Sequence, residues 1–292
     1  MSLPVHPDTA PAHARLPFPS GASVGAVLVT AILVIALIAP WVVPYDPLYQ
    51  NLLAINTPPG PEYWLGVDHL GRDVLSRLIM GSRTTLAISV GGVTLAFFIG
   101  GCLALLGLAL GRVSERLVFG GIDLARAMPD ILLALLLIVA LGSGAVPVAI
   151  ALGVSFSPFF AYVARTAYKR EMAQDYVRAA RLFGGGRLHV LLRHVLPNIA
   201  GGLVTQAAII LPRCIVTESV LSFLGLGSSP DAPTWGRMIS DASRFIEQAP
   251  HAILAPMLTL VLLTVSLLLV GDYSRARLDP LRGARNRQGV MP

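Results

Sequence analysis

Residues 178–198 read RAARLFGGGRLHVLLRHVLPN, and this short basic stretch decides how the chain around it is arranged. It combines four arginines and two histidines with a triple glycine and a proline, and long uncharged runs lie on both sides of it. Of the 292 residues, 54% are hydrophobic and 13% are charged. A soluble domain carries roughly 25% charged residues, so the composition predicts an integral membrane protein.

Cysteine and lysine usage excludes several kinds of site. The two cysteines, Cys102 and Cys214, lie in apolar segments, which gives neither a disulfide framework nor metal-binding spacing. Lys169 is the only lysine and follows no glycine-rich loop. A phosphate-binding loop of the G-x-x-x-x-G-K-[ST] type is therefore absent, so a function that uses ATP needs another chain to bind it. The metalloprotease motif H-E-x-x-H is also absent, which does not favour a membrane-embedded enzyme of that type.

Uncharged runs predict the membrane spans. Residues 21–45 carry no charge and are long enough to cross roughly 30 Å of hydrocarbon. Residues 131–164 are too long for one upright span and too short for two, and the Gly-Ser-Gly sequence at 142–144 suggests a turn. The chain therefore has five or six spans. In the six-span interpretation, the later spans cover about 84–111, 118–141, 145–165, 199–225 and 252–271.

The distribution of positive charge places the opening stretch on the cytoplasmic side. With six spans and the N-terminus inside, 15 basic residues lie inside and 5 outside. With five spans and the N-terminus outside, the ratio is 15 to 6, so charge does not decide the number of spans. Both interpretations place the 166–198 loop and the C-terminal tail in the cytoplasm.

The 166–198 loop is predicted to contain two short amphipathic helices. Apolar residues recur at helical spacing in 171–183 and again in 187–196. Gly184 to Gly186 separate the two helices, and Pro197 is expected to end the second. The pair either lies on anionic lipid or enters a groove on a cytoplasmic partner. The small residues Ala179 and Ala180 favour the partner, because they permit close approach of two backbones.

The same loop resembles the "EAA" loop of ATP-binding-cassette (ABC) importer permeases. The matching positions are Ala179-Ala180, then Gly184, then Leu196-Pro197, whereas Arg178 replaces the motif's glutamate and His194 its apolar residue. The form DYVRAAR…RHVLPN resembles the peptide/nickel class of these permeases. Further segments resemble the "C" type subunit of that class: LGVDHLGRDVLSR at 65–77, ESVLSFLGLG at 218–227, Pro233 with Trp235-Gly236, Gly271-Asp272, and Leu278-Asp279-Pro280.

This resemblance implies an all-α membrane protein with the fold of a type I ABC importer permease and six spans. It also implies a bacterial inner-membrane location with both termini in the cytoplasm. Residues 1–20 form a cytoplasmic N-terminal segment, 21–45 the first span, 46–83 an external segment, and 84–272 a five-helix core that includes the 166–198 coupling loop. Residues 273–292 form a cytoplasmic tail.

The resemblance further implies that the chain is not an enzyme and acts with partners. These are a second permease subunit, two ATPase subunits that bind ATP and Mg, and an external solute-binding protein, within membrane lipid and without nucleic acid. No cofactor or metal is expected in this chain. The residues expected to contact the ATPase are Arg178, Ala179, Ala180, Gly184, Leu196 and Pro197. The expected solutes are di- or oligopeptides, with nickel or a metal-chelate or opine solute as the alternative. A secondary transporter is the rival from another class, but no internal repeat supports it.

Charged residues inside the spans are candidates for the pathway or for structural pairing. Asp123 and Arg126 are three residues apart and are expected to pair. Asp130 follows Pro129 and has no basic residue one turn away, so it either faces the pathway or pairs with the second permease subunit. Arg213 and Glu218 are also pathway candidates, although a separation of five places them on different sides of a helix.

Two tryptophans lie in the predicted external segments. Trp64 and Trp235 are expected either to anchor the chain at the membrane interface or to contact the binding protein.

Overall fold

The computed structural model describes residues 20–229 and 232–278, and within these ranges the regular elements are helices. A single bridge between Val67 and Asp73 is the only strand-type pairing in them. The predicted N-terminal segment, except residue 20, and the tail from residue 279 onward lie outside the described residues. The all-α prediction is confirmed for the part that the structure describes.

Five helices are long and apolar enough to cross a membrane. They are α1 (Ser20–Val42), α2 (Val74–Leu110), α5 (Ala145–Met172), α8 (Leu196–Phe223) and α10 (Pro250–Leu278). A sixth crossing comes from α3 (Arg112–Arg126) and α4 (Asp130–Leu141), when this bent pair is counted as one span.

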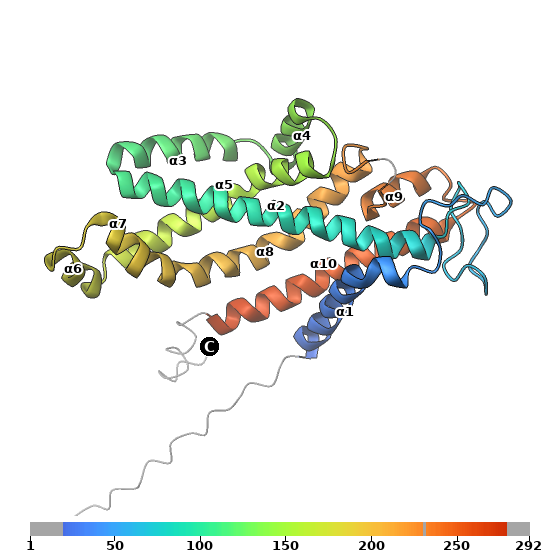
Figure 1. The fold of residues 1–292 in the computed structure, drawn as a ribbon, viewed down its shortest axis with the longest axis horizontal. Coiled ribbons are helices and arrows are strands. Elements are labelled where there is room, and N and C mark those ends of the chain that lie inside the picture. The colour runs from blue at the N-terminus through green and yellow to red at the C-terminus, as the bar shows by residue number, and fades with distance from the viewer. Residues whose placement is uncertain (1–19, 230–231, 279–292) are drawn as a thin grey trace, which may run out of the picture.

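The short helices mark the two ends of the bundle (Figure 1). The junction of α2 and α3 lies at the same end as α6 (Asp175–Leu182) and α7 (Arg187–Val190). The segment between α1 and α2 lies at the opposite end, together with α9 (Trp235–Ser243). With the bent pair as the third passage, the described helices provide the six passages between these ends.

The predicted span 118–141 is not one straight helix. The axes of α3 and α4 differ by 97° at the break between them. Pro129 has extended backbone angles, with ψ at 136°, directly before α4. Proline lacks an N–H and disfavours helical geometry in the residue before it, so a helix ends there and the next one starts in a new direction. Gly142 and Gly144, both with positive φ, then form the turn into α5, as the sequence suggested.

The second span begins ten residues earlier than residue 84, where the uncharged run starts. The side chain of Asp73 caps α2 by accepting a hydrogen bond from the backbone N–H of Ser76. Because Arg77 and Arg83 lie in the first turns of the helix, hydropathy alone does not show where it starts. A helix of 37 residues is about 55 Å long, so α2 extends beyond the hydrocarbon layer.

Small residues allow α2 and α5 to pack closely in the core. A Cβ atom on Gly100 would collide with the carbonyl oxygen of Ser157, and one on Gly92 would lie 2.8 Å from the Cβ of Leu152. Such contacts are the usual basis of helix association in lipid, where backbones approach over small residues. At the cytoplasmic ends of α3 and α5, the Glu115 carboxylate pairs with Arg165 at 2.7 Å and with Lys169 at 2.8 Å. This end of the core is therefore fixed by both packing and charge.

Candidate functional site

The 166–198 loop, which the sequence predicts to be cytoplasmic, folds into two helical segments that turn at the triple glycine. Helix α6 spans Asp175–Leu182, so the predicted helix over 171–183 starts later, because α5 continues to Met172. The backbone N–H of Gly185 donates to the carbonyl of Ala180 at 3.0 Å, and Gly184 has φ of +87°. This is the geometry of a Schellman ending, which favours glycine at the position with positive φ.

The second segment runs without interruption into a membrane span. Helix α7 continues through a π-helical turn, Leu191–Val195, directly into α8. The prediction that Pro197 ends this segment is wrong, because the chain stays helical through Pro197, which comes shortly after the π-helical turn Leu191–Val195. Any force on the loop therefore reaches α8 through continuous helix.

A polar cluster fixes α6 against the start of α8. The hydroxyl of Tyr176 donates to the Glu171 carboxylate at 2.6 Å, and the Asn198 amide donates to the Tyr176 oxygen at 2.9 Å. The hydrogen bond to Glu171 raises the pKa of Tyr176. The same Asn198 amide donates to the carbonyl of His194 at 2.7 Å. Three segments of the loop thus hold one another in a defined orientation, and no sequence pattern indicated this cluster.

The residues expected to contact the ATPase occupy different environments. Arg178 and Ala179 are exposed, and Arg178 pairs with the exposed Asp175 at 3.5 Å. Ala180 is half-buried against the core, and so is Leu196. Gly184 is exposed, and a methyl group added to it would have no atom within 4 Å. Pro197 lines an open groove of about 760 Å³ together with His189, Leu192, Arg193 and His194.

The free end of α6 exposes apolar side chains that no other part of the described chain covers. Leu182 is 87% exposed and Phe183 is 92% exposed, whereas Val177 in the same segment is fully buried. Contiguous apolar side chains that remain in water mark an interaction surface more often than chance. Leu182 and Phe183 therefore form, with Ala179, the exposed face that this loop offers to another molecule.

A cleft within the bundle brings together two of the predicted pathway residues. Asp130 and Arg213 line a cleft of about 400 Å³ between α4, α5, α8 and α10. The Arg213 guanidinium lies 5.2 Å from the centre of the Phe159 ring. The remaining walls are mostly apolar or carry hydroxyl groups, and they consist of Pro129, Ile131, Phe156, Pro212, Val216, Thr217, Thr264 and Leu268.

Glu218, the third pathway candidate, is not at this cleft. Its side chain is fully buried, and its carboxylate accepts a hydrogen bond from Ser222 at 2.6 Å and a longer one from Ser219 at 3.4 Å. Arg213 is exposed to the cleft on the other side of α8. The separation of five residues thus places the two side chains on different sides of the helix.

Asp123 and Arg126 both contact Tyr162 instead of pairing with each other. The hydroxyl of Tyr162 donates to the Asp123 carboxylate. The guanidinium of Arg126 lies 4.6 Å from the centre of the same Tyr162 ring. Among the ion pairs of residues 20–229 and 232–278, none joins Asp123 to Arg126. Tyr162 from α5 separates the two charges, which a spacing rule for one helix does not include.

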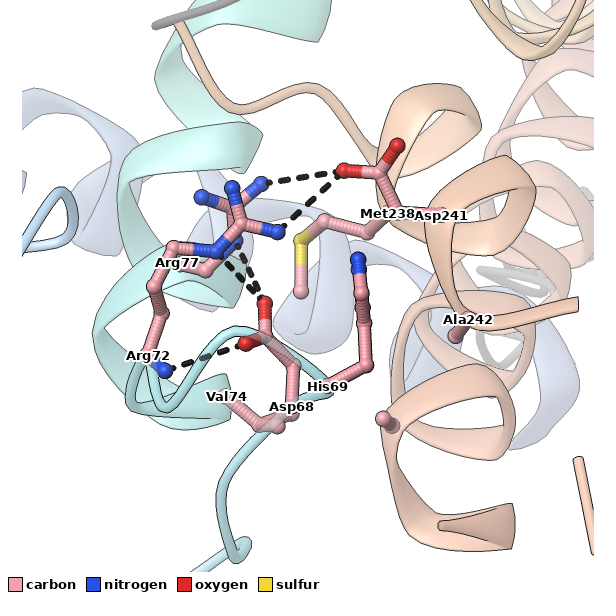
Figure 2. A pocket seen from close by; sticks show the side chains of 9 residues that line it. Asp68, His69, Arg72, Val74, Arg77, Met238, Asp241 and Ala242 are labelled. Atoms are coloured by element: carbon pink, nitrogen blue, oxygen red, sulfur yellow. Dashed lines mark hydrogen bonds and ion pairs between the residues drawn. The ribbon is translucent and has the colours of Figure 1, made fainter. Parts of the chain in front are cut away.

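A second charged cluster, shown in Figure 2, lies at the end of the bundle that carries α9 (Figure 1), which the sequence predicts to be external. Arg72 and Arg77 lie between the carboxylates of Asp68 and Asp241 (Figure 2). The shortest contact, from Arg72 Nε to Asp68, is 2.7 Å, and Asp241 accepts from Arg72 at 3.3 Å. The Arg77 side chain is only 2% exposed, which is rare for arginine unless it is paired. The cluster joins the segment between α1 and α2 to α9.

Neighbouring residues reinforce the external cluster. His69 stacks on Phe245 with ring centres 4.5 Å apart, and His251 contacts the carbonyl of Val67 at 3.1 Å. Burial lowers the pKa of His69; the charge of Asp68 opposes this effect and that of Arg72 adds to it. The sequence contained these charges within the 65–77 motif, but nothing in it linked them to Asp241.

The two external tryptophans have different environments. Trp64 is 71% exposed, as an interface residue or membrane anchor requires. Trp235 is fully buried, and its indole N–H donates to the carbonyl of Leu78 at 3.1 Å. For Trp235 both predicted roles are therefore wrong, because this side chain fills the core between α2 and α9.

Comparison with known families identifies the two parts of the chain. Residues 92–283 match the family described as "Binding-protein-dependent transport system inner membrane component". Residues 20–59 match the "N-terminal TM domain of oligopeptide transport permease C".

Named relatives cover most of the chain. A di/tripeptide transport system permease protein of Pseudomonas aeruginosa is 38% identical over 269 residues, which cover 89% of this chain and 88% of the relative. A glutathione transport system permease protein of Shigella dysenteriae is 36% identical over 263 residues, which cover 89% of this chain and 86% of the relative.

Solved structures show the same fold at low identity. A chain of the inward-facing MetNI methionine ABC transporter has a TM-score of 0.55 and 22% identity, over 68% of this chain and 95% of that one. A chain of an amino acid ABC transporter has a TM-score of 0.54 and 15% identity, over 70% of this chain and 95% of that one. The expected fold of a type I ABC importer permease is confirmed, and the chain belongs to the family of binding-protein-dependent transport system inner-membrane components, as a multi-pass protein of the bacterial inner membrane.

Proposed function

We propose that this chain forms one half of the translocation pathway of an ATP-driven importer for di- and oligopeptides. A second permease subunit forms the other half, and an external binding protein delivers the peptide. Two cytoplasmic ATPase subunits bind ATP and Mg and hydrolyse the ATP, while this chain binds neither. The names of the relatives, a di/tripeptide permease and a permease for glutathione, which is itself a tripeptide, support a peptide over nickel or a metal chelate.

One observation carries the coupling part of this proposal. The exposed face of α6 is fixed to a helix that continues, without a break, into α8. Arg213 on α8 lines the cleft in the bundle. Movement of an ATPase groove that holds α6 is therefore transmitted as a rigid-body rotation of α8 at the cleft.

The residues that we assign to the ATPase contact follow from exposure and from the motif. Ala179, Leu182 and Phe183 supply an apolar face, and Arg178 supplies a charge at its edge. Gly184 ends the helix so that this face projects from the loop. Ala180 and Leu196 act from inside the loop, because they are half-buried and fix the helix, whereas Pro197 is exposed where the loop continues into α8.

The test is ATP-dependent uptake of a labelled dipeptide by the whole complex in liposomes. Replacement of Gly184 by Val should abolish uptake, since φ of +87° strains any residue with a Cβ. Gly186→Val is the matched control, because Gly186 also has free space around it but no positive φ, and uptake should persist. Ala179→Trp tests whether uptake depends on contact with the ATPase and not only on an unstrained loop backbone. Because Ala179 is exposed, the fold should tolerate the large side chain, yet the ATPase should no longer dock.

Normal uptake by both Gly184→Val and Ala179→Trp would refute the coupling assignment. Uptake that a proton gradient drives, with this chain alone in the liposome, would instead support a secondary transporter. Competition by dipeptides and tripeptides, but not by nickel chelates, is the expected selectivity.

A further inference from the structure

The cleft between α4 and α8 carries one acid and one base on otherwise uncharged walls. Asp130 lies in the first turn of α4, and Arg213 lies on α8 beside Pro212. Charged side chains within a membrane bundle are costly and usually mark a solute path. A volume of about 400 Å³ falls within the ordinary range of small-molecule sites, which is roughly 300–1,000 Å³.

The two charges remain available to a ligand. The electrostatic influence of Arg213 and Arg126 reaches the Asp130 carboxyl. Yet neither Asp130 nor Arg213 takes part in an ion pair within residues 20–229 and 232–278. Arg213 instead rests on the face of Phe159, which orients the guanidinium and leaves its N–H donors free.

The other charges near the cleft are already engaged. Arg126 lies over Tyr162, and Asp123 accepts the hydroxyl proton of that tyrosine in a hydrogen bond. The cleft therefore presents a single carboxylate and a single guanidinium, and the rest of its lining includes the ring of Phe156 and aliphatic side chains. A ligand that satisfies both groups carries a cation at one end and an anion at the other, with a short, mostly uncharged body.

We propose that this cleft is a binding site within the membrane for the two charged ends of a short peptide, an inference that rests on the proposed function. The free amino group binds Asp130 and the terminal carboxylate binds Arg213, which is suited to two parallel hydrogen bonds to a carboxylate. Thr217 and Thr264 offer hydroxyl groups to the peptide bond. The site thus recognises what all short peptides share, while the apolar walls accept varied side chains.

The experiment measures equilibrium binding of a radiolabelled dipeptide to the purified membrane complex in detergent, without the binding protein. The wild-type complex should bind the free dipeptide at least tenfold more tightly than its N-acetylated or C-amidated form. Asp130→Asn and Arg213→Gln should each weaken binding of the free dipeptide at least tenfold. Asp130→Asn should leave the affinity for the N-acetylated peptide unchanged, and Arg213→Gln should leave that for the amidated peptide unchanged.

Arg112→Gln is the matched control, because this arginine lies at the start of α3, does not line the cleft and should not change the affinity. Equal wild-type affinity for free and end-blocked peptides would overturn the proposal without any variant. A loss that is the same for all three peptides would also overturn it, since it indicates a structural role. The wild-type complex could take up dipeptide with ATP and yet bind free and end-blocked dipeptides equally well. In that case this site assignment fails and the proposed function stands. Absence of uptake by the wild-type complex would instead contradict the proposed function itself.

Discussion

Two regions at opposite ends of this helical bundle, the cluster around Arg77 and the surface of α6, differ in how their charges are buried. At the external end, Asp68, Arg72 and Arg77 are buried against Asp241, and the four side chains satisfy one another (Figure 2). On α6 at the other end, the pair of Asp175 and Arg178 is exposed, and the apolar side chains of Leu182 and Phe183 are exposed beside it. The first group of charges is paired within the chain, whereas the surface of α6 is the one that we propose for contact with another molecule.

The free energy of an ion pair depends on its burial, which explains why the difference between the two regions is informative. A buried ion pair adds little stability compared with an apolar cluster, but removing one partner leaves an unpaired buried charge. An exposed pair contributes about 0–1 kcal/mol. The cluster around Arg77 therefore fixes the geometry of the loops around α9, while the exposed Asp175 and Arg178 on α6 are free to change partners.

The largest effect is expected from the same substitution at the two ends. Asp68→Ala leaves Arg72 and Arg77 with only Asp241, so the free energy of unfolding should fall by about 3–5 kcal/mol. Asp175→Ala, the control, removes a carboxylate that is 97% exposed and should change it by less than about 0.5 kcal/mol. Denaturation of the purified protein in detergent measures both. Similar losses for the two variants would contradict the contrast between the ends.

At the free end of α6 we expect a smaller effect, which weakens binding of the ATPase and leaves the free energy of unfolding nearly unchanged. Leu182→Ser with Phe183→Ser should leave the free energy of unfolding within about 0.5 kcal/mol of wild type, because both side chains are already in water. The ATPase should be retained at least tenfold more weakly in co-purification. Val177→Ser, at a buried position of the same helix, is the control and should destabilise the loop itself. Full retention of the ATPase by the double variant would show that this face is not the contact.

The smallest effect is a dependence on pH at the external end. Because burial lowers the pKa of His69 below its ordinary value of 6.5, the unfolded chain binds more protons than the folded chain as the solution becomes acidic. The stability of the protein should therefore decrease as the pH falls through about 6.5 and level off below the folded-state pKa. His69→Gln should show a shallower decrease in denaturation curves recorded across this range. An unchanged slope would mean that other groups account for the acid sensitivity.

Much of the architecture follows from local features of the sequence. Uncharged runs indicate the spans, the glycines at 142–144 indicate a turn, and the basic loop indicates the cytoplasmic side. Predictions from averaged hydropathy fail where a single residue determines where a helix starts or ends. Pro129 divides a span, and Asp73 starts α2 among arginines that lower its apparent hydropathy. Pro197 is predicted to end a helix, whereas the chain stays helical from the π-helical turn through Pro197 into α8.

The site was less predictable than the fold, because its contacts join distant segments. Arg72 and Asp241 are 169 residues apart, and Asp123 meets Tyr162 across 39 residues. No spacing rule within one helix encodes such partners. The candidates Asp130 and Arg213 were each visible as charges within a span, but their shared cleft depends on how α4 and α8 pack.

Composition and motif order were enough to establish a helical membrane protein and its family, and they predict the side of the membrane that carries the coupling loop. These properties depend on the composition of neighbouring residues or on the order of motifs along the chain, so no contact between distant segments is needed to predict them. Helix packing was needed to bury Trp235 and Glu218, to place Tyr162 between two charges of α3, and to bring Asp130 and Arg213 to one cleft. The physical reason is that burial and pairing depend on which helices meet, and packing brings together residues that the sequence keeps far apart.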